Sequence, residues 1–378
     1  MIGAEQPHSP LKADSGERAG RYVTIDALRG IAAVSVMFCH AVDSPVSAGL
    51  HRALPEGLLA MMLKGADGVI IFFVISGFVI AHSLRNVTLG PKGVGRFILR
   101  RQLRLDPPYW AAIGLTVVAA AAHNHFRPAT ATPLPSATNL FLSAMYINRI
   151  LGHPRIVPVA WTLCIEVQFY LFFILLLAVG EHRSSRRGPS RRSVTLLVLT
   201  AVGSLAMNPA AFLGVSMTSY WCYFGCGVLC YWTVTQRTRP APLWLAVAGF
   251  ALALAYYRFP SSMIVGLVTL ISLYGAGRMG RLSIWGSSAP LQYLGRISYS
   301  MYLVHVVVLD MLLGALSKTA ATRPLLAICA ACVGLALSIG VAHVFYLVFE
   351  RPSIELAARF RSRPEVRYAV SDGALLVS

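Results

Sequence analysis

Long apolar stretches alternate with short polar ones along most of the sequence. Ten apolar stretches are close to the length that a helix needs to cross a membrane, although the third and the seventh are short. They cover residues 23–42, 67–84, 108–122, 159–179, 194–212, 217–234, 243–257, 262–276, 294–316 and 325–348. The pattern predicts an all-α, polytopic integral membrane helical bundle of about ten transmembrane helices.

The two ends of the chain are more polar. Residues 1–21 are rich in Pro, Gly and Ser and lack the apolar core of a cleavable signal, so we expect a disordered cytoplasmic tail. The membrane domain is expected to span 22–352. We expect 353–378 to form a cytoplasmic C-terminal tail, because its apolar residues are too few to cross a bilayer.

The net charge of +18 suggests a nucleic-acid partner at first, but the positions of the basic residues indicate another cause. With the ten stretches alternated from an inside N-terminus, the inside segments hold 23 Lys and Arg and the outside segments hold eight. This bias follows the positive-inside rule. We therefore expect both termini in the cytoplasm and no nucleic-acid partner. The composition, 56% hydrophobic and 13% charged, also fits a membrane protein.

The seven cysteines all fall in the apolar stretches. Cys222, Cys226 and Cys230 share one helical stripe. We expect them to pack as small apolar residues, because consecutive turns of one helix offer poor tetrahedral geometry for zinc. The sequence thus predicts no metal site and no permanently bound cofactor.

An arginine and a histidine interrupt the first apolar stretch. Arg29 and His40 are eleven residues apart, so on a helix they differ by about 20° around the axis and by roughly 16 Å along it. Ionisable side chains are costly in a bilayer, and two on one stripe indicate a functional site facing protein or a watered cavity. Asp26 is placed for an ion pair with Arg29. Either residue alone would also fit a structural role at a helix end.

The second and fourth stretches carry further polar residues. Ser76 and Gly77, within FFVISGF, favour close helix packing with Ser76 as an interhelical donor, and no neighbouring base marks Ser76 as a nucleophile. Glu166 follows Trp161 and lies several residues inside the fourth stretch. A carboxylate at that depth indicates function, and His40 is its candidate partner.

A basic cluster precedes the third stretch. Arg100, Arg101 and Arg104 lie just before two prolines. Arg100 and Arg104 are one turn apart on one face, a geometry suited to gripping phosphates. The positive-inside rule or contact with anionic lipid would explain the cluster equally well.

The ninth stretch places three polar residues on a rough stripe. They are Ser298, Tyr302 and His305. Tyrosines are common at membrane interfaces, so Tyr302 alone says little. His305 lies deeper, where a functional role and a buried histidine with one hydrogen bond are equal alternatives.

Taken in order, these features resemble the membrane-bound acyltransferase-3 family. The matching motifs are Arg29 and His40 with ten residues between them, FFVISGF, RRQLR followed by PYW, W-x-L-x-x-E ending at Glu166, LGRISYSMYLVH at 294–305, and Glu-Arg-Pro at 350–352. The resemblance runs from about Tyr22 to Pro352. Asp106 departs from it, because a bulky apolar or aromatic residue is usual there.

The resemblance implies an O-acyltransferase of the bacterial cytoplasmic (inner) membrane. Such an enzyme moves an acyl group, acetyl by family frequency, from acyl-CoA to a hydroxyl of a cell-envelope or exported carbohydrate. Its donor would dock with its phosphates on the inner basic cluster and be held further by Arg29. Acceptor contacts are expected in the outside loop 123–158. The residues that would bind the acyl-CoA donor are Arg100, Arg101, Arg104 and Arg29. The residues that would support the acceptor or the site are Trp161, Ser76, His305 and Tyr302.

For the chemistry, the resemblance implies His40 as the general base on the acceptor hydroxyl, with Glu166 holding the imidazole and Arg29 assisting. An acyl-histidine intermediate on His40 is the rival route. A macrolide-like small molecule is the alternative acceptor. A multi-helix transporter or flippase and a purely structural scaffold are the alternatives from other classes.

Overall fold

The computed structural model describes residues 22–85, 87, 89–180, 188–207, 216–320 and 322–360, and the regular elements in this part of the chain are all helical, as predicted. The expected tail 1–21 and residues 361–378 lie outside the described residues. The α-helices are α1 (Val23–Val42), α2 (Ser47–Ala53), α3 (Glu56–Leu63), α4 (Gly68–Leu84), α5 (Pro91–Phe126), α6 (Ala137–Ala144), α7 (Trp161–Gly180), α8 (Arg191–Ser204), α9 (Trp221–Val234), α10 (Ala241–Tyr256), α11 (Ser261–Arg278), α12 (Ala289–Arg296), α13 (Ser298–Ala320), α14 (Pro324–Phe345) and α15 (Arg351–Arg359).

Within the described residues, six helical segments are long and apolar enough to cross a membrane. They are Val23–Val42, Glu56–Leu84, Pro158–Gly180, Ser261–Arg278, Ser298–Leu316 and Pro324–Arg359. These six match the first, second, fourth, eighth, ninth and tenth predicted stretches. The fifth and sixth correspond to helices α8 and α9 of only 14 residues each, which span about 21 Å and fall short of a hydrocarbon core. A membrane protein is therefore supported, whereas the count of ten and the orientation of the termini stay predictions.

The third stretch is part of a much longer helix than the sequence indicates. Helix α5 runs for 36 residues and contains Pro107 and Pro108 in its interior, although a proline disfavours helix at the residue before it. Contacts with other parts of the chain hold this region: Tyr146 donates a hydrogen bond of 2.8 Å to Asp106, and its ring stacks on Tyr109. The basic cluster consequently lies inside a helix and not ahead of one.

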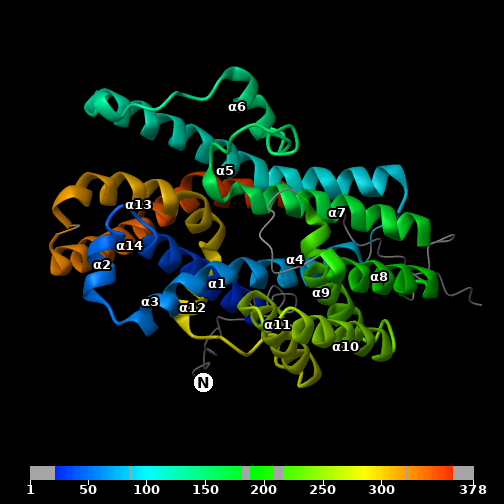
Figure 1. Cartoon of the computed structure of the whole chain (residues 1–378). Helices are drawn as coiled ribbons and strands as arrows, with labels where there is room; N and C mark the ends of the chain where they lie inside the picture. Colours follow the sequence, from blue (N-terminus) through cyan, green and yellow to red (C-terminus); the bar gives the residue numbers. More distant parts are fainter. Residues whose placement is uncertain are drawn as a thin grey trace, which may run out of the picture.

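The remaining helices are arranged around α1 and α4, which lie in contact at the centre of the bundle (Figure 1). Helix α12 and the paired helices α13 and α14 pack on α1, while α9 and α11 pack on α4. Helices α8 and α10 extend the bundle beyond α9. The long helix α5 runs along another side, where α15 packs against it. The first part of the predicted C-terminal tail is therefore a packed helix.

Glycine allows a very close helix contact between α4 and α9. A Cβ atom at Gly77 would lie 2.0 Å from the carbonyl oxygen of Phe224, and one at Gly227 would lie 2.1 Å from that of Val74. Because side chains cannot occupy these positions, the two backbones meet directly. The predicted role of the Ser76–Gly77 pair in close packing is confirmed for Gly77.

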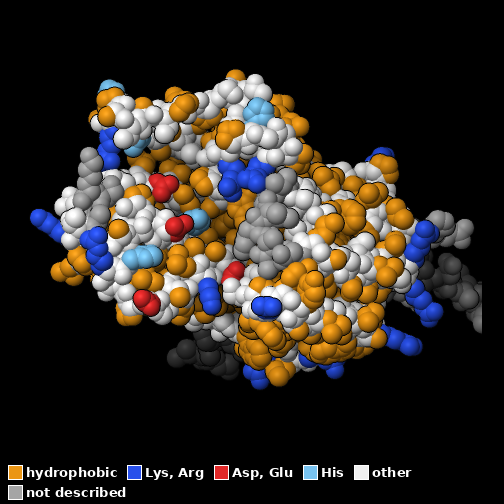
Figure 2. All heavy atoms as spheres, viewed as in Figure 1, with side chains coloured by type: hydrophobic (Ala, Val, Ile, Leu, Met, Phe, Trp, Pro, Cys, Tyr) orange, Lys and Arg blue, Asp and Glu red, His pale blue; other side chains and the backbone are white. Residues whose placement is uncertain are grey.

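The outer surface of the bundle is strongly apolar. Figure 2 shows hydrophobic side chains covering the face over α10 and α11. They include Leu252, which is 75% exposed, and Val268 and Ile271, which are more than half exposed. Apolar patches of this extent are typical of a surface that contacts lipid.

Candidate active site

A cavity of about 570 Å³ lies between the ends of several helices and is called here the central cavity. Its wall is drawn from α1, α4, α5, α7, α12, α13 and the segment that follows α14. Residues that are distant in the sequence thus meet at one place. The predicted site residues that line it are Arg29, Ser76, Arg101, Arg104, Glu166 and Tyr302.

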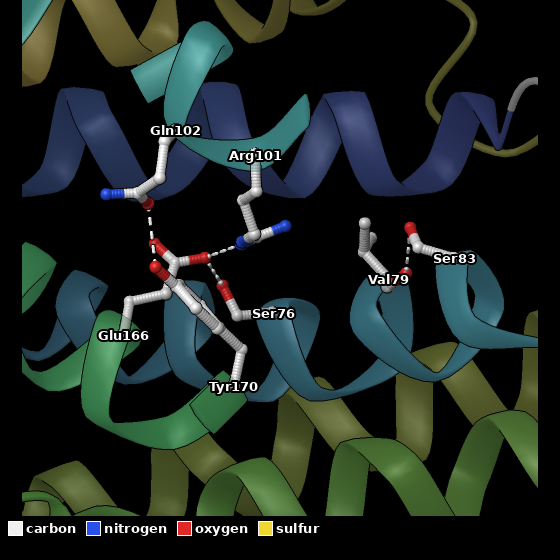
Figure 3. Close-up of polar contacts among 7 residues, drawn as sticks. All are labelled: Ser76, Val79, Ser83, Arg101, Gln102, Glu166 and Tyr170. Carbon is white, nitrogen blue, oxygen red and sulfur yellow. Dashed lines mark hydrogen bonds and ion pairs between the residues drawn. The ribbon is translucent and has the colours of Figure 1, made fainter. Parts of the chain in front are cut away.

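Glu166 is the hub of the polar contacts in this wall (Figure 3). Its Oε1 atom accepts a hydrogen bond of 2.9 Å from the Ser76 hydroxyl and forms an ion pair with Arg101. The Arg101 guanidinium also lies over the ring of Tyr170, whose hydroxyl donates a 2.7 Å hydrogen bond to Gln102. The side chains of Arg101 and Glu166 are 16% and 18% exposed. Three helices, α4, α5 and α7, are therefore tied together at one carboxylate.

This arrangement corrects the predicted partnership of Glu166 with His40. Among the described residues, the hydrogen bonds and ion pairs of Glu166 go to Ser76 and Arg101. The cause is the length of α5: Arg101 lies ten residues into that helix, roughly 15 Å from its start, and so reaches the depth of Glu166. A guanidinium is a stronger partner for a desolvated carboxylate than a neutral imidazole.

The cluster on α5 also differs in detail from the prediction. The cavity wall contains Arg101 and Arg104 but not Arg100. Residues three apart share a helix face just as residues four apart do, so the pair on the cavity side is Arg101 with Arg104. Arg29 lies in the same wall, where the charges of Arg104, Asp26 and Glu166 act on it. The charge of Asp26 thus acts on Arg29, and a direct ion pair between the two stays a prediction.

His40 is not among the residues that line the central cavity. It lies behind the cavity wall, next to His305. Its ring centroid is 5.2 Å from that of His305, and the His305 ring is 6.0 Å from that of Tyr302, which does line the cavity. His305 is 1% exposed. Its Nδ1 is 2.9 Å from the carbonyl oxygen of Met301, while its buried Nε2 atom has no hydrogen-bond partner among the described residues.

The protonation of His305 follows from these contacts. A carbonyl oxygen only accepts hydrogen bonds, so Nδ1 carries the hydrogen and donates it to Met301. In the neutral ring, Nε2 therefore holds a lone pair. The structure thus sets an unsatisfied acceptor beside the ring of His40, where the sequence had indicated a carboxylate.

Tyr302 lies between the cavity and the histidine pair, because it lines the cavity and its ring is 6.0 Å from that of His305. The Tyr302 hydroxyl donates to the carbonyl oxygen of Val159 at 3.0 Å and lies 2.9 Å from the Thr162 hydroxyl. Trp161 packs against the rings of Phe73 and Tyr220 and is not among the lining residues. Its role is therefore to support the start of α7.

Glu350 is a functional candidate to which the sequence reasoning gave no role. It is 3% exposed, lines the central cavity, and accepts hydrogen bonds from the backbone nitrogen and the hydroxyl of Ser300, at 3.0 and 2.6 Å. Arg104 and Arg29 act electrostatically on it. Glu350 ends a π-helical segment, Tyr346–Glu350, a feature frequent at functional sites. The Glu-Arg-Pro motif was the available signal.

The chain matches the model of the acyltransferase domain of the acyltransferase-3 family (Acyl_transf_3) over residues 22–343. A protein of Bacillus subtilis (strain 168) named peptidoglycan O-acetyltransferase YrhL is 25% identical over 332 residues, which are 76% of this chain and 49% of that protein. The chain therefore spans about half the length of this relative.

Two further relatives are of more similar length. Nodulation protein 10 of Rhizobium leguminosarum bv. viciae is 27% identical over 331 residues, covering 78% of this chain and 85% of the relative. A protein of Komagataeibacter xylinus named membrane-bound transacylase BcsY is 28% identical over 312 residues, covering 74% and 71%. No solved structure matches the chain. The family match over most of its length shows that the chain belongs to the acyltransferase-3 family and is a membrane acyltransferase.

Proposed function

We propose that the protein transfers an acyl group, acetyl in the first instance, from acyl-CoA to a hydroxyl of a cell-envelope or exported carbohydrate. The observation that carries this proposal is the central cavity, in which the family's motif residues from α1, α4, α5 and α7 meet. The names of two relatives, a peptidoglycan O-acetyltransferase and a transacylase, support a carbohydrate acceptor and acyl transfer. A macrolide-like acceptor is the alternative within the same reaction class.

The donor is proposed to enter the cavity from the predicted cytoplasmic side. The guanidinium groups of Arg29, Arg101 and Arg104 give the wall hydrogen-bond donors suited to the carbonyl oxygen of a thioester. Glu166 and Ser76 would act as positioning residues, because they hold the Arg101 guanidinium in place. No metal or bound cofactor enters this proposal, and acyl-CoA is a substrate.

His40 is proposed as the general base. An N–H of its ring would donate to the lone pair on Nε2 of His305, which leaves the other ring nitrogen free to accept the proton of the acceptor hydroxyl. The hydroxyl oxygen then attacks the thioester carbonyl, the tetrahedral intermediate collapses, the C–S bond breaks, and the imidazolium returns the proton to the leaving CoA sulfur. His305 thus takes the positioning role that the sequence had assigned to Glu166.

The rival route passes through an acyl-histidine on His40. The position of His40 supports the acyl-histidine route. His40 lies outside the central cavity, and Tyr302 and His305 lie between His40 and the cavity. Trapping a labelled acyl group on His40 in the absence of acceptor would identify this route, whereas strict ternary-complex kinetics would favour direct transfer.

The cellular test of the function compares the ester content of envelope carbohydrates in cells with and without the protein. We expect His40→Ala to abolish the added ester, whereas His51→Ala, at an exposed histidine of α2, should leave it unchanged at equal protein level. Acylation that persists in His40→Ala would overturn the assignment of the base. Transport of an unmodified substrate without acylation would favour the transporter alternative.

A further inference from the structure

The central cavity continues along one stripe of α4 to the end of that helix. Phe72, Ser76, Val79 and His82 all line it, and the separation of ten positions between Phe72 and His82 corresponds to roughly 15 Å of helix. Tyr22, directly before α1, lines the same end as His82. The cavity is therefore elongated, with the Ser76–Glu166 contact in its interior and Tyr22 and His82 at one extremity.

A cluster of rings and guanidinium groups surrounds this extremity. The Tyr22 hydroxyl is 3.2 Å from Nδ1 of His82, and the rings of Tyr22 and Tyr231 stand edge-on to that of His82. Arg85 forms hydrogen bonds with Nε2 and with the carbonyl oxygen of His82, and its side chain also bonds to Tyr231. Arg237 donates to the carbonyl oxygen of Arg85 at 3.4 Å. We call these five residues the Arg85–Arg237 cluster.

The hydrogen bonds of His82 leave donors of the cluster directed outward. Because a guanidinium only donates, Nε2 of His82 accepts from Arg85, and Nδ1 of the neutral ring donates to the Tyr22 oxygen. The Tyr22 hydroxyl hydrogen is then free for another acceptor. Burial and the neighbouring Tyr231 raise the pKa of Tyr22, whereas the positive charges of Arg85 and Arg237 lower it. The charges of both guanidinium groups therefore act on this hydroxyl.

Charge distinguishes this end of the cavity from its interior. The interior wall carries three carboxylates, Asp26, Glu166 and Glu350, which offset much of the charge of its arginines. By contrast, the ion pairs of the described residues include no carboxylate partner for Arg85 or Arg237. A ligand with several phosphates gains most where positive charge is not already paired. Its apolar or neutral portion would fit the balanced interior.

We propose that Tyr22, His82, Arg85 and Arg237 bind the phosphorylated nucleotide end of the acyl-CoA donor. The guanidinium groups and the Tyr22 hydroxyl would contact phosphate oxygens, and the aromatic edges would pack against the adenine ring. The pantetheine arm would lie along the α4 stripe, so that the thioester reaches the wall beside Ser76 and Tyr302. This inference rests on the proposed acyl-CoA donor, and it moves the phosphate contacts away from the arginines of α5.

The test is steady-state kinetics of the full-length protein in phosphatidylcholine vesicles, with acetyl-CoA and with acetyl-pantetheine as donors. We expect the double variant Arg85→Gln/Arg237→Gln to raise KM for acetyl-CoA by at least about tenfold, with a much smaller effect on kcat. Acetyl-pantetheine, which has the thioester arm but no phosphate, should show no comparable change. Arg239→Gln is the matched control, since Arg239 is exposed and lies two residues from Arg237.

Three results would overturn the inference. The first is a double variant whose KM for acetyl-CoA stays within twofold of that of the unmodified protein. The second is a rise in KM that occurs only when the vesicles contain phosphatidylglycerol, because the cluster would then bind lipid headgroups. The third is an unmodified protein that transfers nothing from acetyl-CoA, a result that overturns the proposed function as well.

Discussion

The imidazole rings of His40 and His305 lie with their centroids 5.2 Å apart, one on α1 and the other on α13. His305 is fixed by its hydrogen bond to Met301, and its buried Nε2 atom has no partner in the part of the chain that the structure describes. A buried acceptor left unsatisfied costs free energy, so this atom is expected to accept a hydrogen bond from another group. The relationship places a neutral histidine where hydrolases commonly place a carboxylate.

If His305 positions His40, its acceptor atom matters more than its bulk. We expect His305→Phe to lower kcat about 10- to 100-fold, whereas His305→Gln, whose amide oxygen can accept in place of Nε2, retains more of the activity. The dependence of kcat on pH should also shift in His305→Phe, because His40 loses its acceptor. Equal kcat values and equal pH profiles for the two variants would leave His305 with a packing role only.

The Arg101–Glu166 ion pair should behave as a coupled unit. Replacing either partner leaves a mostly buried charge unpaired, at a cost of about 3 kcal/mol. We therefore expect Glu166→Gln and Arg101→Gln each to lower the melting temperature in detergent, and the double variant to recover part of the loss. The exposed Arg351–Glu355 pair, with side chains 60% and 63% exposed, is the control and should show weak coupling. Additive losses at residues 101 and 166 would contradict the assigned contact.

Two variants of Glu350 can separate the effect of its negative charge from the effect of its hydrogen bonds to Ser300. In Glu350→Gln the amide oxygen can still accept from Ser300, while one negative charge beside Arg29 and Arg104 is removed. We expect a stable protein with a lower KM for the anionic donor. Glu350→Ala should cost about 1–3 kcal/mol in stability, because the Ser300 N–H is then buried without a partner. Melting temperatures and donor KM values measure both effects, and a Gln variant as unstable as the Ala variant would contradict them.

The contact of α4 with α9 should tolerate no side chain at Gly77. A Cβ atom there would lie 2.0 Å from a backbone oxygen that cannot move independently, so Gly77→Ala should cost about 1–3 kcal/mol or more. Gly114→Ala is the control, since nothing lies within 4 Å of its Cβ position and alanine favours helix. The melting temperatures of the two variants in detergent measure this difference in stability. Equal stability would show that the helices can separate without cost.

The residues of the central cavity could be predicted from sequence because ionisable groups in apolar stretches are costly wherever they occur. This reasoning identified Arg29 and Glu166, whereas Arg101 and Arg104 were predicted as part of the basic cluster that precedes the third stretch. Their partners could not be predicted in the same way, since the depth of each residue depends on where its helix begins. Helix α5 starts well before its apolar portion, and this carries Arg101 to Glu166.

Other parts of the site depend on contacts that the hydrophobic pattern of the sequence does not indicate. Glu350 reaches Ser300 because the helix widens into a π-helical turn, which no hydrophobic pattern indicates. Tyr22 and His82 lie at opposite ends of their helices and meet only through the packing of α1 on α4. His305 was identified as a candidate, but its neighbour His40 lies on a helix distant in the sequence, so the pairing required the fold.

The most direct test of the central claim is the transfer of labelled acetyl from acetyl-CoA to a carbohydrate acceptor by the purified protein in vesicles. We expect label in an alkali-sensitive ester on the carbohydrate with the unmodified protein and with His51→Ala, and none with His40→Ala at the same melting temperature. Undiminished ester formation by His40→Ala would contradict the proposed chemistry. Absence of ester formation by the unmodified protein, with envelope carbohydrate supplied, would contradict the proposed function itself.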